Sequence, residues 1–194
     1  GGAADQAAHS VQPGAHGGWV VRLPDVLGAV RSLWVGPREA SEGLLGTLPA
    51  LPAQVWPWLD VMSGVARIQL PTVDQFVPQM INFEVIGGVN FKKGCYPGQE
   101  IVARSQYRGT LKRRLHLAHS DAMASVGQEV FSADDPGQPA GLVANVAPIP
   151  GGQGCSVLME LKLAHAGSTL SLGAPDGPSL SVDALPYEIP PQDA

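Results

Sequence analysis

Cys95 is the residue of this sequence best suited to covalent chemistry. It is one of two cysteines and stands just before a predicted short helix, for which Pro97 suits the first position and residues 99–106 continue the helical pattern. The positive end of a helix and the neighbouring Lys92 and Lys93 both favour a thiolate over a thiol. The pattern therefore predicts a reactive, partly exposed cysteine. A buried structural cysteine is the alternative, because unpaired cysteines are among the most often buried residues.

The second cysteine, Cys155, lies sixty positions further along and enters an alternating segment, which predicts a core residue. Two cysteines this far apart do not form a disulfide framework or a zinc site, and an iron–sulfur cluster usually takes four thiolates. The nearest histidines, His116 and His119, fall in a different predicted element. A cysteine–histidine hydrolase is therefore poorly supported.

Cys95 also lies in the most basic segment of an acidic chain. Positions 92–114 hold seven of the twelve Lys and Arg and a single acid, Glu100, although the formal net charge of the chain is −5. Guanidinium groups bind carboxylates and phosphates through two hydrogen bonds, so the segment predicts either an anion clamp or a solvated basic face. Since the rest of the chain is acidic, direct binding of nucleic acid is not expected. The candidate clamp residues are Arg104, Arg108, Lys112, Arg113 and Arg114.

The elements that would position these residues are read from alternation, helical spacing and turn residues. Residues 1–17 are rich in Gly, Ala and His and predict a linker or loop. Further along, the patterns predict strands at 19–23, 32–35 and 66–70 and helices at 25–31, 38–48 and 53–63. From position 111, alternating segments separated by Gly, Pro and Asp predict about five strands of a small antiparallel barrel or sandwich.

These elements give an α+β fold with a mixed domain at 18–110 and a β-barrel domain at 111–194. With 44% hydrophobic and 15% charged residues, the composition is that of a globular protein. No run of 18 apolar residues and no signal peptide is visible, which predicts a cytoplasmic protein without a membrane span.

The segment Lys93-Gly94-Cys95-Tyr96-Pro97-Gly98-Gln99-Glu100-Ile101-Val102-Ala103-Arg104 resembles the signature of the YgfZ family. These proteins are folate-binding relatives of the glycine-cleavage T-protein, an aminomethyltransferase. The flanking segments 76–82, 87–91, 109–115 and 185–187 are also similar to that family.

The resemblance implies a T-protein-like fold, in which subdomains surround a cavity for tetrahydrofolate and a C-terminal β-barrel closes it. Residues 18–110 would then be the C-terminal part of the folate-binding domain, and we expect its N-terminal part to be missing from this sequence. In the family the motif cysteine is critical, and here that position is Cys95. The other motif positions, expected to serve folate binding, are Lys93, Gly94, Tyr96, Gln99, Glu100 and Arg104.

The family is implicated, in a folate-dependent way, in the assembly or repair of iron–sulfur proteins and, through them, in tRNA modification. The resemblance therefore implies a folate-binding accessory protein with Cys95 as its working thiol, and it implies no particular reaction. Two alternatives stay open. One is a tetrahydrofolate-dependent aminomethyltransferase acting on a lipoyl carrier protein, although that chemistry needs no cysteine in this loop. The other is a non-catalytic module that binds anions or RNA through the basic segment.

Overall fold

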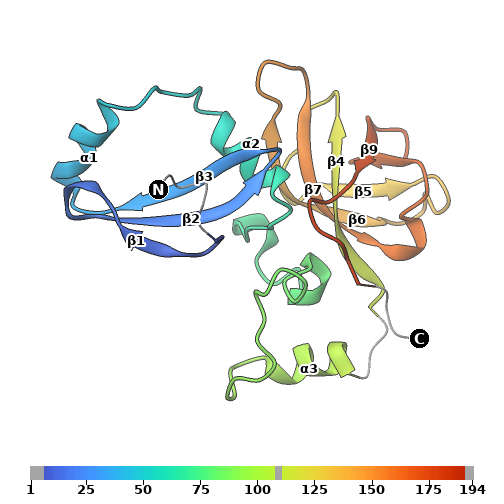
Figure 1. Cartoon of the computed structure of the whole chain (residues 1–194). Coiled ribbons are helices and arrows are strands. Elements are labelled where there is room, and N and C mark those ends of the chain that lie inside the picture. The colour runs from blue at the N-terminus through green and yellow to red at the C-terminus, as the bar shows by residue number, and fades with distance from the viewer. Residues whose placement is uncertain (1–6, 108–110, 191–194) are drawn as a thin grey trace. The chain divides into compact units, whose positions relative to one another are not determined.

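The computed structural model describes residues 7–107 and 111–190 (Figure 1). The chain divides into two compact units, residues 1–55 and 56–194, which are described in turn. The boundaries predicted at 17 and 110 stay predictions, and the division by contacts falls at a different place.

The first unit is a three-stranded antiparallel sheet followed by a helix. The strands are β1 (Val11–Pro13), β2 (Trp19–Val26) and β3 (Ala29–Val35), in the order β1-β2-β3, and the short 3-10 helix η2 (Ala15–Gly17) joins the first two. Helix α1 (Arg38–Leu45) then forms as predicted. The prediction of a linker at 1–17 is wrong at β1, because its backbone pairs with β2 from Val11 to Pro13.

The predicted helix at 25–31 is also wrong, because this segment is the turn of a hairpin. Leu27 and Gly28 have φ angles of +51° and +76°, the left-handed conformation that a two-residue hairpin turn requires. The strand pairing shifts register between Leu23 and Val26, so Pro24 lies at an irregularity where a missing N–H is tolerated. The chain thus continues as strand through Pro24 and folds back on itself.

The second unit begins with helical segments that lead to the motif. They are α2 (Val55–Met62), the 3-10 helices η3 (Leu70–Thr72) and η4 (Pro78–Ile81), and α3 (Gln99–Tyr107). Both α-helices were predicted at these places, whereas the predicted strand at 66–70 is wrong. Instead of joining a sheet, the extended backbone of Arg67 bonds to one side chain: its N–H donates to Asn145 Oδ1, and Asn145 Nδ2 donates to its carbonyl, both at 2.9 Å.

The rest of the unit is a closed six-stranded antiparallel barrel (Figure 1). Its strands are β4 (Arg113–Ser120), β5 (Glu129–Ser132), β6 (Gly141–Pro148), β7 (Cys155–Lys162), β8 (Leu170–Leu172) and β9 (Ser179–Asp183), and η5 (Leu163–His165) follows β7. The order around the barrel is β4-β7-β6-β5-β8-β9, and β9 pairs with β4. Five of the strands were predicted, and the three-residue β8 was missed. Closure leaves no open sheet edge.

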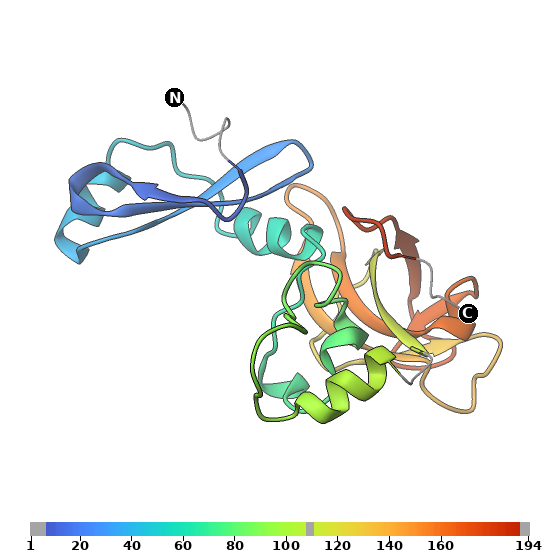
Figure 2. The ribbon, with the colours of Figure 1, turned by 60° about the horizontal axis from the view of Figure 1, so that its bottom comes forward.

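Strand β7 is buried on both faces and joins two hydrophobic cores. Val157, Met159 and Leu161 lie in the core that fills the barrel. Leu158 points the other way and packs in a second core with residues of α2, η4, β4 and β6. The 3-10 helix η4 contacts both β4 and α3, which places the motif helix beside the barrel wall (Figure 2).

The structure therefore confirms a mixed helix-and-sheet protein with a closed antiparallel barrel. In the part of the chain that is described, no helix has the length and apolar character needed to cross a membrane.

Candidate functional site

The motif loop runs into α3 through a turn that is fixed by its own residues. Gly98 has a φ of +80°, a conformation that glycine adopts without strain. The N–H of Tyr96 donates to Gln99 Oε1 at 3.3 Å, and the N–H of Gln99 donates to the carbonyl of Tyr96 at 3.2 Å. The helix begins at Gln99, so Pro97 lies before it and not in its first turn, because the left-handed Gly98 intervenes.

Cys95 is exposed on this loop, which agrees with the sequence prediction and excludes a buried structural role. Lys92 and Lys93 are exposed beside it in the chain. The ammonium of Lys93 lies 4.6 Å from the centroid of the Tyr96 ring, a cation–π contact that orders this lysine within the loop. The thiol is thus accessible within a basic loop, and its activation by positive charge stays a prediction.

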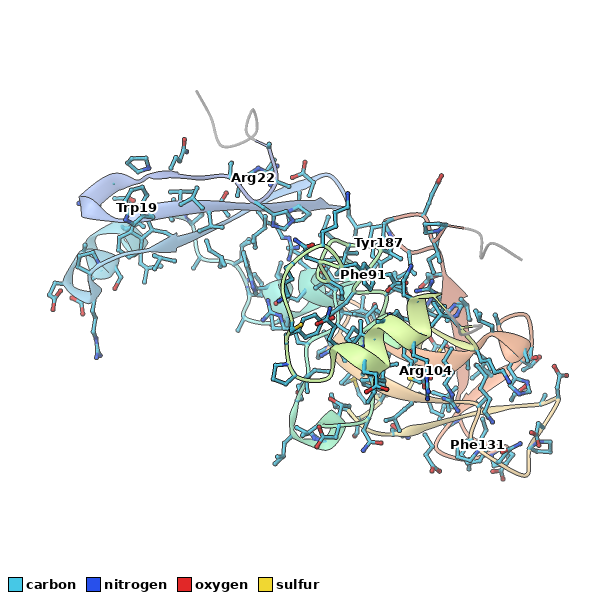
Figure 3. The ribbon with its side chains drawn as sticks, turned by 90° about the horizontal axis from the view of Figure 1, so that it is seen from below. Trp19, Arg22, Phe91, Arg104, Phe131 and Tyr187 are labelled. Carbon is cyan, nitrogen blue, oxygen red and sulfur yellow. The ribbon has the colours of Figure 1, made fainter. Side chains whose placement is uncertain are left out.

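The other predicted motif residues lie on the same loop and helix as Cys95. Gly94, Glu100 and Arg104 are exposed, and Arg104 lies on α3 (Figure 3). Tyr96 and Gln99 are half-buried and bonded to each other. None of these residues lines the cavity beside Trp56 or the cavity around the Arg113–Glu160 ion pair. Their role in folate binding stays a prediction.

Behind the motif helix lies a buried polar network that sequence reasoning missed. Gln79 on η4 is fully buried, and its Nε2 donates to the carbonyl of Val102 on α3 at 2.7 Å. Nη1 of Arg114 on β4 donates to the carbonyl of Gln79 at 3.1 Å and pairs with the carboxylate of Glu84. Gln79 and Arg114 together fasten α3 to the barrel wall.

Asn82 extends the same network toward the C-terminal segment. Its φ of +60° ends η4 in the left-handed conformation. Its amide meets the backbone of Leu115 on β4, with Nδ2 donating to the carbonyl at 3.1 Å and Oδ1 accepting from the N–H at 3.3 Å. Nδ2 also lies 3.4 Å from the Tyr187 hydroxyl, which donates to the carbonyl of Gly64 at 2.7 Å, and burial raises the pKa of Tyr187. The sequence did contain an indication of this network, because Gln79 and Asn82 are amides within an otherwise apolar segment.

The basic segment is only in part an open cationic surface. Arg114 is buried, so a solvated face is wrong at this position. Arg113 on β4 donates to both carboxylate oxygens of Glu160 on β7. Arg104 and Lys112 are exposed, whereas Arg108 falls outside the described residues.

Cys155, unlike Cys95, is buried. Its thiol is fully buried in the barrel core, donates to the carbonyl of Ala122 at 3.2 Å and accepts from the N–H of Ala124 at 3.3 Å. Burial raises the pKa of the Cys155 thiol, which lowers its reactivity. Its structural role is as predicted, and it provides an internal reference for the exposed thiol.

Among residues 56–107 and 111–190, two cavities bear on ligand binding. The larger, of about 390 Å³, lies between α2, residues 65–69 and β6, and its lining includes Trp56, Ile68, Gln69 and Val146. The smaller, of about 240 Å³, lies on the outer face of the barrel around the Arg113–Glu160 pair.

Comparison with known proteins gives the relationship of the chain. No family model matches it. A tRNA-modifying protein YgfZ from Cronobacter sakazakii is 37% identical over 130 residues, which cover 56% of this chain and 40% of the relative. Proteins of the same name from Edwardsiella ictaluri and Photobacterium profundum are 46% identical over 67 residues and 38% identical over 91. The chain is thus related to the YgfZ family. The resemblance noted from its motif is confirmed.

The match to YgfZ proteins is partial in length. The aligned residues from Edwardsiella and Photobacterium cover 34% and 43% of this chain, and 20% and 28% of those relatives. The chain therefore spans two-fifths or less of the length of the curated YgfZ proteins that it matches.

Proposed function

We propose that this chain is part of a folate-binding accessory protein of the YgfZ type. It would act in the assembly or repair of iron–sulfur proteins and thereby affect tRNA modification, with Cys95 as the working thiol. The observation that carries this proposal is the exposed Cys95 in a basic loop fixed by Tyr96 and Gln99. The relatives are named tRNA-modifying proteins, which supports a role connected with tRNA modification.

Accessibility is the physical reason to assign the chemistry to Cys95. A thiol must reach its partner to accept or pass on a group, and Cys155 is closed off by the barrel. The side chains of Lys92 and Lys93 are exposed near Cys95 in the same loop, so an anionic partner would be attracted to the place where the thiol is presented.

Two features of the described residues motivate the choice of tetrahydrofolate, and the proposal includes the T-protein-like fold that the resemblance implies. The glutamate carboxylates of tetrahydrofolate match the exposed cations Lys92, Lys93 and Arg104. Its flat ring system matches the cavity of about 390 Å³ beside Trp56, a volume within the usual range of ligand sites. When bound, folate would supply one-carbon carrier chemistry, while the chain would bind its ring and tail and present the thiol.

The thiol and folate roles are separable by experiment. In a strain deficient in iron–sulfur enzymes, the Cys95→Ser variant of the complete protein should lose rescue while its folate affinity stays within about twofold. Cys155→Ala is the matched control, because it also removes one thiol, and it should retain rescue. Full rescue by Cys95→Ser would exclude the thiol role.

Folate binding has its own readout in tryptophan fluorescence. Titration of tetrahydrofolate into the complete protein should quench emission, and Trp56→Phe should remove much of that quenching. Unchanged quenching in this variant would exclude the cavity beside Trp56 as the ring site. Formation of methylenetetrahydrofolate from an aminomethylated lipoyl carrier would identify an aminomethyltransferase instead.

A further inference from the structure

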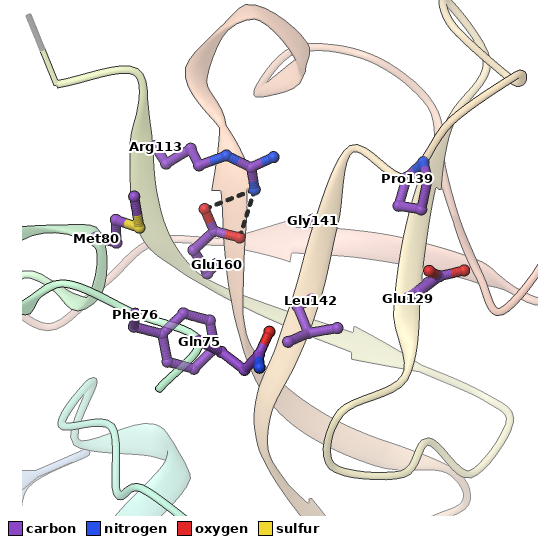
Figure 4. A pocket seen from close by; sticks show the side chains of 9 residues that line it. All are labelled: Gln75, Phe76, Met80, Arg113, Glu129, Pro139, Gly141, Leu142 and Glu160. Atoms are coloured by element: carbon purple, nitrogen blue, oxygen red, sulfur yellow. Dashed lines mark hydrogen bonds and ion pairs between the residues drawn. The ribbon is translucent and has the colours of Figure 1, made fainter. Parts of the chain in front are cut away.

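The smaller cavity, on the outer face of the barrel, has the composition of a second ligand site (Figure 4). Its volume of about 240 Å³ corresponds to roughly eight water molecules at about 30 Å³ each, which is the space of one or two rings. It contains no residue of the Cys95 motif and shares none with the cavity beside Trp56. Its lining is Gln75, Phe76, Met80, Arg113, Glu129, Pro139, Gly141, Leu142 and Glu160.

Glu160 is the buried polar group of this cavity. It lies on β7 in register with Leu115 of β4 on one side and Leu142 of β6 on the other. Its side chain is only 3% exposed. Gly141 keeps the neighbouring strand close, because a Cβ there would lie 2.1 Å from the carbonyl oxygen of Glu160. The fold thus holds a carboxylate against apolar neighbours at the barrel surface.

Arg113 offers hydrogen-bond donors beside this carboxylate. Its Nη1 alone donates to both oxygens of Glu160, at 2.7 and 2.8 Å. Throughout residues 7–107 and 111–190, no other partner of the Arg113 side chain is found, so its Nε and Nη2 donors remain available. The cavity therefore presents guanidinium donors and carboxylate acceptors side by side.

The charges in and beside the cavity nearly cancel, which favours a neutral ligand. Arg113 and Glu160 neutralise each other, and the charge of Glu129 is offset by Lys162, which lies close enough to act on Glu160. A small anion would be repelled by the two carboxylates, and a cation would be repelled by the guanidinium that shares the site. The walls formed by Phe76 and Leu142 suit a flat apolar ring.

We propose that this cavity binds a flat, neutral heterocycle with a lactam edge, in which an N–H adjoins a C=O as in uracil and guanine. The carbonyl would accept from the guanidinium of Arg113, the N–H would donate to the carboxylate of Glu160, and the ring would pack against Phe76 and Leu142. A free nucleoside and a base held in RNA carry the same edge. The pterin ring of tetrahydrofolate also carries this edge, so folate is a competitor to be tested, but the site shares no residue with the cavity beside Trp56 or with the Cys95 motif.

The edge is tested with ligands that differ by one methyl group. Calorimetric titration of the full chain with uridine and guanosine should show binding. The analogues 3-methyluridine and 1-methylguanosine lack the lactam N–H and should bind at least about tenfold more weakly, because a site built to bond an N–H rejects a ligand without it. Equal binding of parent and methylated nucleosides, or no binding of either parent at millimolar concentration, would overturn the proposal.

Two variants locate the site. Leu142→Trp should fill the cavity, and Arg113→Lys should keep the charge but remove the planar donor pair. Each should weaken uridine binding by about tenfold or more, whereas Ile68→Trp in the other cavity should leave it unchanged. Circular dichroism establishes that each variant is folded. Undiminished uridine binding by a folded Leu142→Trp or Arg113→Lys variant would refute the location.

Competition experiments with bound uridine distinguish a free nucleoside from a base in RNA, and they test whether this cavity is separate from the folate site. Displacement of uridine by a single-stranded oligouridylate would identify a base carried by RNA. Uridine binding without such displacement would identify a free nucleoside, and both outcomes support a lactam site. Displacement of uridine by tetrahydrofolate would overturn the assignment of a separate site.

Discussion

Removal of Arg113 tests how the barrel tolerates its buried carboxylate. In Arg113→Met the guanidinium is lost and both oxygens of Glu160 lose their donor. Breaking a buried ion pair from one side costs about 3–5 kcal/mol. Because the Arg113 side chain is 31% exposed and water can reach the cavity, we reduce this to about 2–3 kcal/mol of unfolding free energy at pH 8.

The cost should depend on pH in a definite direction. Burial raises the pKa of Glu160 above its ordinary value, and the Arg113 hydrogen bond acts against this rise. Without Arg113 the folded-state pKa rises further, so between the unfolded and folded values the folded variant holds a proton that the unfolded chain does not. The contribution of Glu160 to stability is then greatest below its unfolded pKa and is lost as pH rises through its folded pKa. The penalty should be about 1 kcal/mol at pH 4, where most of the carboxyl is protonated in both states.

Urea unfolding at pH 4, 6 and 8, followed by tryptophan fluorescence, measures these values. The double variant Arg113→Met/Glu160→Gln should recover about 1–2 kcal/mol at pH 8 and lose the added pH dependence. The exposed Arg104→Met is the matched control and should change stability by less than about 0.5 kcal/mol. An equal penalty for Arg113→Met at pH 4 and pH 8, or no recovery in the double variant, would refute the reasoning.

Three further substitutions test the network and the barrel by the same urea assay. Asn82→Ala should lower the free energy of unfolding by about 2–4 kcal/mol, since it leaves backbone groups of β4 without partners; a loss below about 1 kcal/mol would contradict this. Tyr187→Phe removes the bond to Gly64 and should cost about 1 kcal/mol, and wild-type stability would show that the bond contributes nothing. Gly154→Ala should cost more than about 3 kcal/mol, because its Cβ would lie 1.9 Å from the carbonyl of Ser120 and φ is +73°; a change under 1 kcal/mol would show that the strand ends relax.

The barrel could be predicted from the sequence because its signals are local. Strands such as β7 alternate apolar and polar residues between Gly-rich turns. This pattern can be recognised without knowing which strands pair with one another. Two predicted elements were wrong, one for a local reason and one for a long-range reason. Asp25 resembles a helix N-cap, but the left-handed turn at Leu27 and Gly28 makes the segment a hairpin. Residues 66–70 alternate like a strand, but the Asn145 side chain takes the place of a strand partner.

The site was predictable to a smaller extent. The helix after Cys95 followed from residue types in one short segment, and the exposure of Cys95 was one of the two alternatives that this segment left open. The partners of Arg113 and Arg114 did not, because the sequence shows a run of cations and gives no indication of which carboxylates the fold brings to them. Glu160 comes from a strand paired with β4 and reaches Arg113 across 47 positions of the chain.

The bond from Tyr187 to Gly64 has a consequence for the order in which the protein folds during synthesis. It joins positions 123 residues apart, and Trp58 on α2 similarly meets Ser156 on β7, 98 residues away. Strand β4 has its second neighbour only when β9 exists. During synthesis, the segment around α2 therefore gains these two bonds only after Ser156 and Tyr187 have left the ribosome. Contacts of such long range make folding slow, and the apolar residues of α2 stay uncovered until strands β4, β6 and β7, against which they pack, have been synthesised.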